Sequence, residues 1–211
     1  MQTDIRAAGP HEVAAAAAVL AEAFVADPVL AELAPDRPGV ARHRLLTGLF
    51  TALVRSVPAH ARALDVAVVA DGSGADTVVG ASFWEAPHPH RGGTLAFLRQ
   101  VPAFLRVLGV TGALRAAGYL RRMQRARPGV PHWYLGEVGV AASARGTGVG
   151  GRLIDHALAR VDRDGGHAYL ESSTPRNRRL YRRLGFTDGP PLHGFRVAAP
   201  VAMWRPAGGP G

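Results

Sequence analysis

The chain has 211 residues, 47% of them apolar, and contains no cysteine. This length supports a domain with its own hydrophobic core, and the absence of thiols excludes disulfides, cysteine catalysis and cysteine–zinc sites. The formal net charge is +9, but all 25 basic residues are arginine, which together with frequent Ala, Gly and Pro is typical of a compositional bias. Because no basic stripe with interleaved aromatics accompanies the charge, we do not expect nucleic-acid binding.

The N-terminal half predicts a strand, two helices and a hairpin. Residues 3–7 suit a short strand, and Pro10 opens an alanine-rich helix to about residue 25. Prolines interrupt ADPVLAELAPDRPG before a second helix over about residues 40–56. DVAVVADG and TVVGASFWEAP predict two strands joined by a Gly/Ser/Asp turn. The acidic start argues against a signal peptide and no apolar run is long enough for a membrane span, so we expect a soluble, cytoplasmic protein.

The C-terminal half alternates helices and strands. Residues 93–126 are helical in pattern, and Pro102 with the pair Gly109 and Gly112 predicts two helices here. The remaining predicted elements are a strand over 133–140, a helix over 148–163, a strand over 167–173, a helix over 175–184 ending at Gly185, and closing strands after Phe186 that include RVAAPVAMW. Without repeats or a linker, the sequence predicts one α/β domain over residues 1–205 and a flexible tail over 206–211.

A glycine-rich segment, RGTGVGGRL, connects the strand at 133–140 to the helix at 148–163. It fits the dinucleotide-binding pattern G-x-G-x-x-G, and Glu171 lies close to the position where that motif has an acidic residue. However, five residues separate the strand from Gly146, too many for the tight turn of that motif. In addition, too few residues follow Glu171 to form further βαβ units. A P-loop is excluded because it needs a lysine and the chain contains none. The helix start can instead hold a pyrophosphate on its free N–H groups, which glycines leave accessible. A flexible connection without a ligand is the remaining alternative.

Two motifs resemble one known family. EVGVAASARGTGVGGRLIDHAL resembles the acetyl-coenzyme A (acetyl-CoA) motif of the GNAT superfamily of N-acetyltransferases, and STPRNRRLYRRLGF resembles that family's second signature. With the preceding strand they span residues 132–187, and their detail is most similar to the puromycin N-acetyltransferase-like group. The resemblance implies a GNAT fold: a mixed, mostly antiparallel sheet of about six to seven strands, with splayed central parallel strands and flanking helices.

The resemblance also implies how the co-substrate acetyl-CoA binds. Its pantetheine arm would bond to the backbone of Val138 and Val140, and Asn177 would bind the arm through its side chain. Its pyrophosphate would take backbone N–H groups from Arg145, Gly146, Gly148, Val149 and Gly150. Splayed strands make physical sense in this role, because their unpaired backbone groups need a partner.

The implied reaction is direct attack of a neutral amine on the thioester. It needs a base, a donor to the thioester oxygen and an acid for the leaving thiolate. Tyr181 matches the family's acid, although a tyrosine that only packs the core is the alternative. The backbone N–H of Val140 is the candidate donor to the oxygen.

Two carboxylates are candidates for the base. Glu137 lies on the binding strand and Glu171 at the end of the next one, and either could act directly or through water, unless an arginine engages it. His132 is a candidate proton relay. In a regular strand Glu137 would share a face with Trp133 and Leu135, which a bulge would change.

The acceptor pocket is less defined by the sequence. Trp84 could stack on a substrate ring, with an ordinary core position as the alternative, and Glu85 could hold an ammonium. The apolar positions of 93–126 could pack on the sheet or roof the pocket. The His-x-His pair in PHPHRGG lacks a third ligand nearby, so we expect no metal.

These features together lead to an expected function. We expect a monomeric or homodimeric enzyme that acetylates a primary amine of a small molecule, such as an aminonucleoside or another amine antibiotic, and so confers antibiotic resistance. One alternative is acetylation of a protein or aminoacyl-tRNA amine. Another is a non-catalytic module that binds acyl-CoA.

Overall fold

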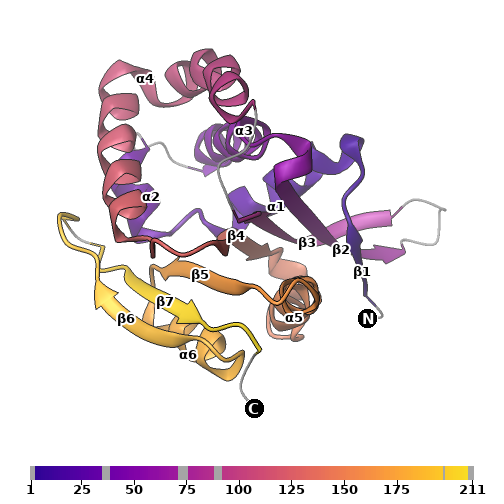
Figure 1. The fold of residues 1–211 in the computed structure, drawn as a ribbon. Coiled ribbons are helices and arrows are strands. Elements are labelled where there is room, and N and C mark those ends of the chain that lie inside the picture. Colours follow the sequence, from indigo (N-terminus) through magenta and orange to yellow (C-terminus); the bar gives the residue numbers. More distant parts are fainter. Residues whose placement is uncertain (1–2, 35–38, 71–75, 88–91, 197, 209–211) are drawn as a thin grey trace.

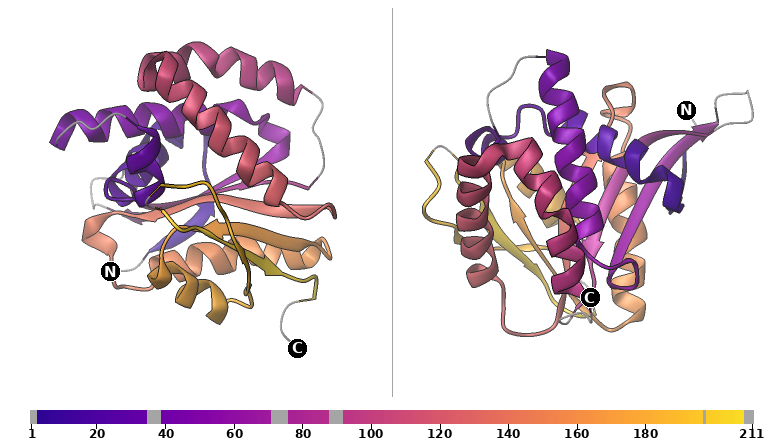
Figure 2. Two further views of the ribbon diagram at one scale, coloured as in Figure 1. Left: turned by 90° about the vertical axis from the view of Figure 1, so that its left-hand side faces the viewer. Right: turned by 90° about the horizontal axis from the view of Figure 1, so that it is seen from above.

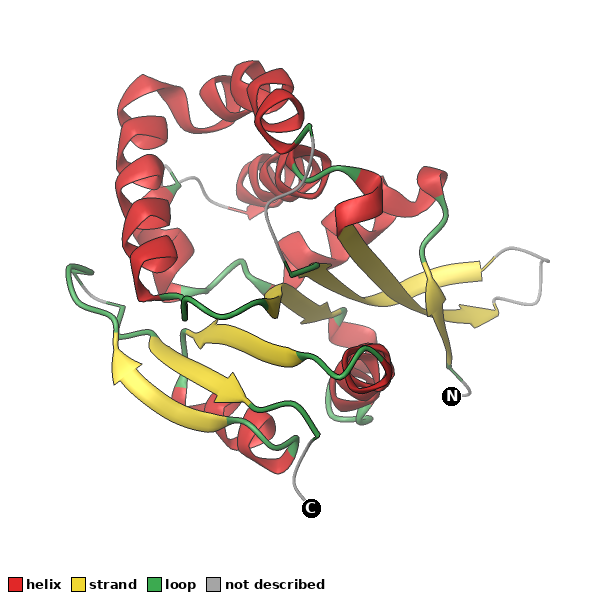
Figure 3. Cartoon of the chain, in the orientation of Figure 1, coloured by secondary structure: helices red, strands yellow, loops and turns green. Residues whose placement is uncertain are grey.

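The computed structural model describes residues 3–34, 39–70, 76–87, 92–196 and 198–208 (Figure 1). A seven-stranded sheet in the order β1-β2-β3-β4-β5-β7-β6 has helices on both faces (Figure 3). Neighbouring strands are antiparallel except for the parallel pair β4 and β5. This architecture confirms the predicted α/β class and strand number. The predicted His-x-His pair and the last three residues of the predicted tail lie outside the described residues.

The elements follow the predicted order. The strands are β1 (Asp4–Ala7), β2 (Arg62–Ala70), β3 (Asp76–Glu85), β4 (His132–Val140), β5 (His167–Ser172), β6 (Thr187–Pro191) and β7 (Val201–Arg205). The helices are α1 (Val13–Ala23), α2 (Pro28–Leu33), α3 (Gly39–Ser56), α4 (Gly93–Ala126), α5 (Val149–Arg163) and α6 (Pro175–Arg183), with short 3-10 turns at Pro10–Glu12, Ala59–Ala61 and Ala142–Ala144. None of the helices in the described ranges is long and apolar enough to cross a membrane.

The helices form two layers around the sheet (Figure 2). α1 to α4 cover one face, where the buried core includes Leu20, Leu46, Phe50, Val66 and Phe83. α5 and α6 cover the other face, where Trp84, Leu135, Ile154, Leu170 and Tyr181 are packed together. The central strands are thus covered on both faces, whereas β6 is exposed along its whole length.

Two helices, α2 and α4, contain prolines or glycines that usually end or bend a helix. α2 forms within the proline-interrupted stretch because Asp27 caps it, accepting from the backbone N–H groups of Val29 at 2.9 Å and Leu30 at 3.1 Å. α4 is bent at Gly109, whose φ of 68° is not helical, so two helical segments exist as predicted. Pro102 is accommodated within the first segment.

The parallel strands β4 and β5 are paired only at their N-terminal ends. The register runs from His132 opposite His167 to Tyr134 opposite Tyr169, and β4 continues for six residues beyond it. The central strands therefore splay, as predicted. The edge of β4 that faces β5 is open beyond Tyr134.

A bulge in β4 corrects the predicted facing of Glu137. Phe83 of β3 lies opposite Glu137, but the next β3 residue lies opposite Leu135, so Gly136 is an extra residue. Glycine fits here because a Cβ would lie 3.1 Å from the Phe83 ring. A Cβ on Gly139 would lie 2.7 Å from Ala23 of α1. Since residues 137 and 139 share a face, Glu137 points toward the α1–α4 layer, opposite to Leu135.

Candidate active site

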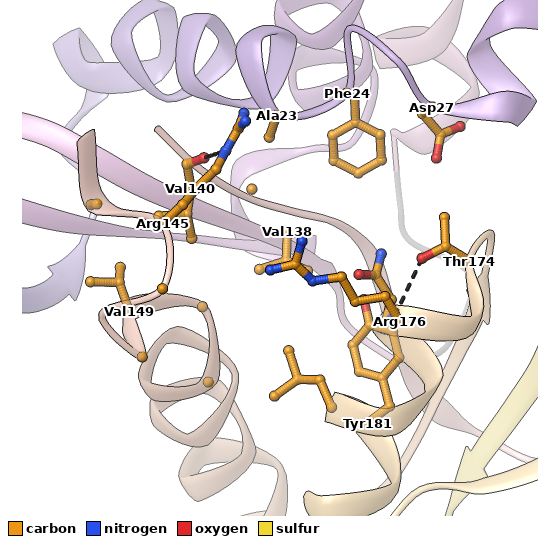
Figure 4. Close-up of a pocket in the computed structure, with 18 of the residues that line it drawn as sticks. Ala23, Phe24, Asp27, Val138, Val140, Arg145, Val149, Thr174, Arg176 and Tyr181 are labelled. Atoms are coloured by element: carbon orange, nitrogen blue, oxygen red, sulfur yellow. Dashed lines mark hydrogen bonds between the residues drawn. The ribbon is translucent and has the colours of Figure 1, made fainter. Parts of the chain in front are cut away.

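A cavity of about 470 Å³, hereafter the large cavity, opens between β4, the starts of α5 and α6, and the C-terminal end of α1 (Figure 4). All the residues predicted to contact the co-substrate line it: Val138, Val140, Arg145, Gly146, Gly148, Val149, Gly150 and Asn177. Tyr181 also lines it. A smaller cavity of about 40 Å³, hereafter the gap cavity, adjoins it between β4 and β5.

The β4 wall presents backbone groups to the gap at alternate residues. The Ala141 N–H donates to the Val79 carbonyl of β3 at 2.9 Å, which fixes the phase of this antiparallel ladder. Gly139 and Ala141 therefore direct their backbone groups to β3, whereas Val138 and Val140 direct theirs into the gap. The Val140 carbonyl accepts from Arg145 Nε at 3.3 Å, in line with this direction.

The glycine turn before α5 requires glycine for its backbone conformation. Gly146 has φ 80° and Gly148 has φ 82°, a region that side-chain-bearing residues rarely adopt. A Cβ at either position would meet nothing within 4 Å, so packing does not explain these glycines. The turn leaves the first N–H groups of α5 without helical acceptors and with the positive end of the helix dipole. Such a helix start binds anions.

The start of α6 aligns Asn177 with Tyr181. Thr174 caps the helix by accepting from the Asn177 backbone N–H at 3.3 Å. Asn177 and Tyr181 are one helical turn apart, and both line the large cavity and the gap cavity. The Tyr181 ring packs edge-on against Phe186 with centroids 5.9 Å apart. Burial raises the pKa of Tyr181, and the carboxylates of Glu137 and Asp27 raise it further.

The two candidate bases differ in their surroundings. Burial raises the pKa of Glu137 well above its usual range, and the Asp27 and Glu171 carboxylates add to this. Glu137 lines neither cavity, and among the described residues it has no hydrogen-bond or ion-pair partner. Glu171 lines the gap cavity, and its Oε2 accepts from the Tyr134 hydroxyl at 2.8 Å. Burial also raises the Glu171 pKa, while that hydrogen bond and the Arg127 charge counteract the rise.

Asp27 is a component of the large cavity that the sequence interpretation missed. Its Oδ2 accepts from Ser173 Oγ at 2.6 Å, which connects the α1–α2 junction to the β5–α6 junction. The available signal was the pair Asp27–Pro28, a capping residue followed by a proline at the first helical position.

The predicted acceptor residues are placed differently from the expectation. Trp84 is fully buried in the core beside Trp133 and lines neither cavity, because its side chain points to the α5 face. This position contradicts stacking on a substrate. Glu85 forms an ion pair at 3.4 Å with Arg127, whose guanidinium lies 3.5 Å from the centroid of the Tyr134 ring. The negative charge of Glu85 is therefore already paired with Arg127.

The other predicted polar groups lie apart from the cavities. His132 lines neither, its Nδ1 is 2.7 Å from the Val130 carbonyl, and burial lowers its pKa. In the part of the chain that the structure describes, no group of three or more His, Asp or Glu side chains could hold a metal ion.

Comparison with known proteins supports one family. The acetyltransferase (GNAT) family model matches residues 82–186, which contain the glycine turn and both candidate bases. A structure from Corynebacterium glutamicum, described as histone acetyltransferase HPA2 and related acetyltransferase, is 28% identical, with 100% of this chain and 99% of that chain covered and a TM-score of 0.75.

Two more distant structures share the fold. Arylalkylamine N-acetyltransferase 2 from Aedes aegypti is 13% identical, with 97% of this chain and 98% of that chain covered and a TM-score of 0.59. Polyamine N-acetyltransferase from Drosophila melanogaster is 19% identical, with 96% and 98% covered and a TM-score of 0.55. The family model and the C. glutamicum structure together support the GNAT superfamily of acetyltransferases for this chain. It is an acetyl-CoA-dependent enzyme.

Proposed function

We propose that the protein transfers an acetyl group from acetyl-CoA to a primary amine of a small molecule. The observation that carries the proposal is one continuous cavity lined by the glycine turn, the open edge of β4 and Tyr181. The turn offers donors for phosphate, the edge offers donors and acceptors for an amide-containing arm, and the tyrosine lies where the two cavities adjoin. These are the chemical requirements for a carrier thioester.

The residues lining the large cavity fit acetyl-CoA. The backbone N–H groups from Gly146 to Gly150 would hold its pyrophosphate, whereas the Arg145 N–H, predicted to do the same, already donates to the Ala142 carbonyl at 3.3 Å. The backbone groups of Val138 and Val140 that face the gap would bind its pantetheine arm. The Asn177 side chain would bind the same arm from α6. When bound, the co-substrate supplies an activated acetyl group as a thioester.

Glu137 is favoured as the base because its carboxylate is uncommitted, whereas Glu171 is engaged by Tyr134. Its raised pKa makes its carboxylate a stronger base than that of an exposed glutamate, which favours proton abstraction from an ammonium. The free amine forms a bond to the acetyl carbon as the carbon–sulfur bond breaks. The Val140 N–H polarises the thioester oxygen, and Tyr181 donates its proton to the departing thiolate.

The electrostatics of the acceptor side match a cationic amine. Glu137 faces the α1–α4 layer, and Asp27 and Glu171 are close enough to raise its pKa. The combined negative charge of these carboxylates would attract a protonated amine before it loses its proton. The amine would approach from this side of the sheet, opposite to the α5 face.

The resemblance to the puromycin N-acetyltransferase-like group supports an aminonucleoside or another amine antibiotic as the acceptor, and so a role in resistance within the cytoplasm. A protein amine is a second candidate. It is supported by the similarity to the C. glutamicum structure, whose description names a histone acetyltransferase.

An acceptor screen tests the proposal. Thiol release from acetyl-CoA is measured with puromycin-like aminonucleosides, other amine antibiotics, polyamines and lysine-containing peptides, at equal concentrations. Turnover on small amines supports the first candidate, and turnover confined to peptides supports the second. Tight co-substrate binding without turnover on any amine would indicate a non-catalytic module and contradict the proposal.

A further inference from the structure

Arg176 is an uncommitted cation at the mouth of the large cavity. It is the second residue of α6, it is exposed, and its guanidinium extends across the cavity toward the glycine turn (Figure 4). It has no hydrogen-bond or ion-pair partner among the residues that the structure describes. An extended arginine without a partner, aimed over a cavity, is available to an anionic ligand.

The other arginine of the cavity is already engaged. Arg145 Nε donates to the Val140 carbonyl at 3.3 Å, and its terminal nitrogen donates to the Glu22 carbonyl at 3.2 Å. Figure 4 shows its side chain directed toward Ala23 of α1, away from the centre of the cavity. Arg145 therefore fixes the turn to α1, and Arg176 is the cavity-lining arginine left to bind a ligand.

The backbone of Arg176 lies in the first turn of α6. Thr174 caps the helix, and Pro175 occupies its first helical position with a fixed φ. The cation thus projects from a rigid base on one wall, while the N–H groups at the start of α5 project from the other. Two sets of donors facing each other across a cavity define a slot for an anion between them.

We propose that Arg176 binds a phosphate group of the co-substrate across the large cavity from the glycine turn, and so selects acetyl-CoA over carriers that lack phosphate. The inference rests on the proposed function, because it assigns the same cavity to acetyl-CoA. A guanidinium binds phosphate through two parallel hydrogen bonds, which an amide side chain cannot replace.

The test compares Arg176→Gln with Arg179→Gln by titration calorimetry. Arg179 is exposed on the same helix but does not line the cavity, so the control removes the same charge. Charged hydrogen bonds of this kind contribute enough that we expect Arg176→Gln to weaken CoA binding about tenfold to hundredfold. Arg179→Gln should retain the wild-type Kd, and pantetheine should bind both variants as it binds the wild type. Thermal melting checks that both variants are folded.

3′-Dephospho-CoA identifies the phosphate. If Arg176 binds the 3′-phosphate, Arg176→Gln and the wild type should bind dephospho-CoA with equal Kd. If Arg176→Gln still binds dephospho-CoA more weakly than the wild type, Arg176 binds the diphosphate. Either result supports the proposal. Unchanged CoA affinity in Arg176→Gln, or an equal loss in Arg179→Gln, would overturn it while leaving the proposed function intact. Failure of the wild type to bind CoA would overturn both.

Discussion

Gly148→Ala separates the conformational role of the glycine turn from its binding role. Gly148 has φ 82°, and a Cβ there would meet nothing within 4 Å. The substitution therefore introduces backbone strain without a clash, at a cost of about 1–2 kcal/mol. For a chain of this size each 1 kcal/mol lowers Tm by roughly 2–4 °C, so we expect a decrease of roughly 2–8 °C.

The same substitution should weaken acetyl-CoA binding. Relief of the strain moves the turn, and the N–H groups at the start of α5 lose their alignment with the pyrophosphate. A hydrogen bond to a charged group contributes about 1.5–3 kcal/mol, so losing one raises Kd on the order of tenfold to hundredfold. Titration calorimetry measures this directly.

Gly165→Ala is the matched control. Gly165 follows the C-terminal end of α5 with φ 60°, and a Cβ there also meets nothing within 4 Å. It does not line the large cavity. We expect a similar decrease in Tm with an unchanged Kd. If Gly148→Ala lowers Tm but binds acetyl-CoA as tightly as the wild type, the turn does not hold the pyrophosphate and the reasoning fails.

Four further substitutions test the chemistry. Tyr181→Phe should lower kcat about 10²- to 10⁴-fold with little change in the Kd for acetyl-CoA, and an unchanged kcat would exclude Tyr181 as the acid. The protonated form of Glu137 cannot accept a proton, so kcat/KM should rise as the pH rises through the raised pKa of Glu137. Glu137→Gln should abolish this pH dependence, whereas Glu171→Gln should retain it. The folded-state pKa of Glu137 exceeds the unfolded value of 4.5, so ionisation opposes folding above that pH, and Glu137→Gln should raise Tm at pH 8 more than at pH 4. Asp27→Asn retains a side chain that can cap α2 but removes a negative charge that raises the Glu137 pKa. The pH dependence of kcat/KM should therefore move to lower pH without a large loss of stability. An unchanged pH profile would argue against Glu137 as the titrating base.

The parts of the site that depend on local sequence were predictable. The glycine turn combines positive φ at Gly146 and Gly148 with an amphipathic helix immediately after it, and both signals lie within one short segment. The β-propensity of Tyr169 and Leu170 similarly indicated β5. The resemblance to one family then supplied the splay between them, which no local pattern encodes.

The parts that depend on contacts between distant segments were not predictable. The facing of Glu137 reverses because Gly136 bulges against Phe83 on another strand. Trp84 is core because α5 packs over it, which strand alternation alone does not specify. Asp27 had a local capping signal, but its bond to Ser173 joins residues 146 positions apart.

The most direct test of the account is a crystal structure of the protein with CoA. We predict the diphosphate within hydrogen-bond distance of the Val149 and Gly150 amide nitrogens, and the pantetheine arm between β4 and β5 beside Val138 and Val140. Density for CoA at another surface, with those amides bonded to protein or solvent, would contradict the central claim.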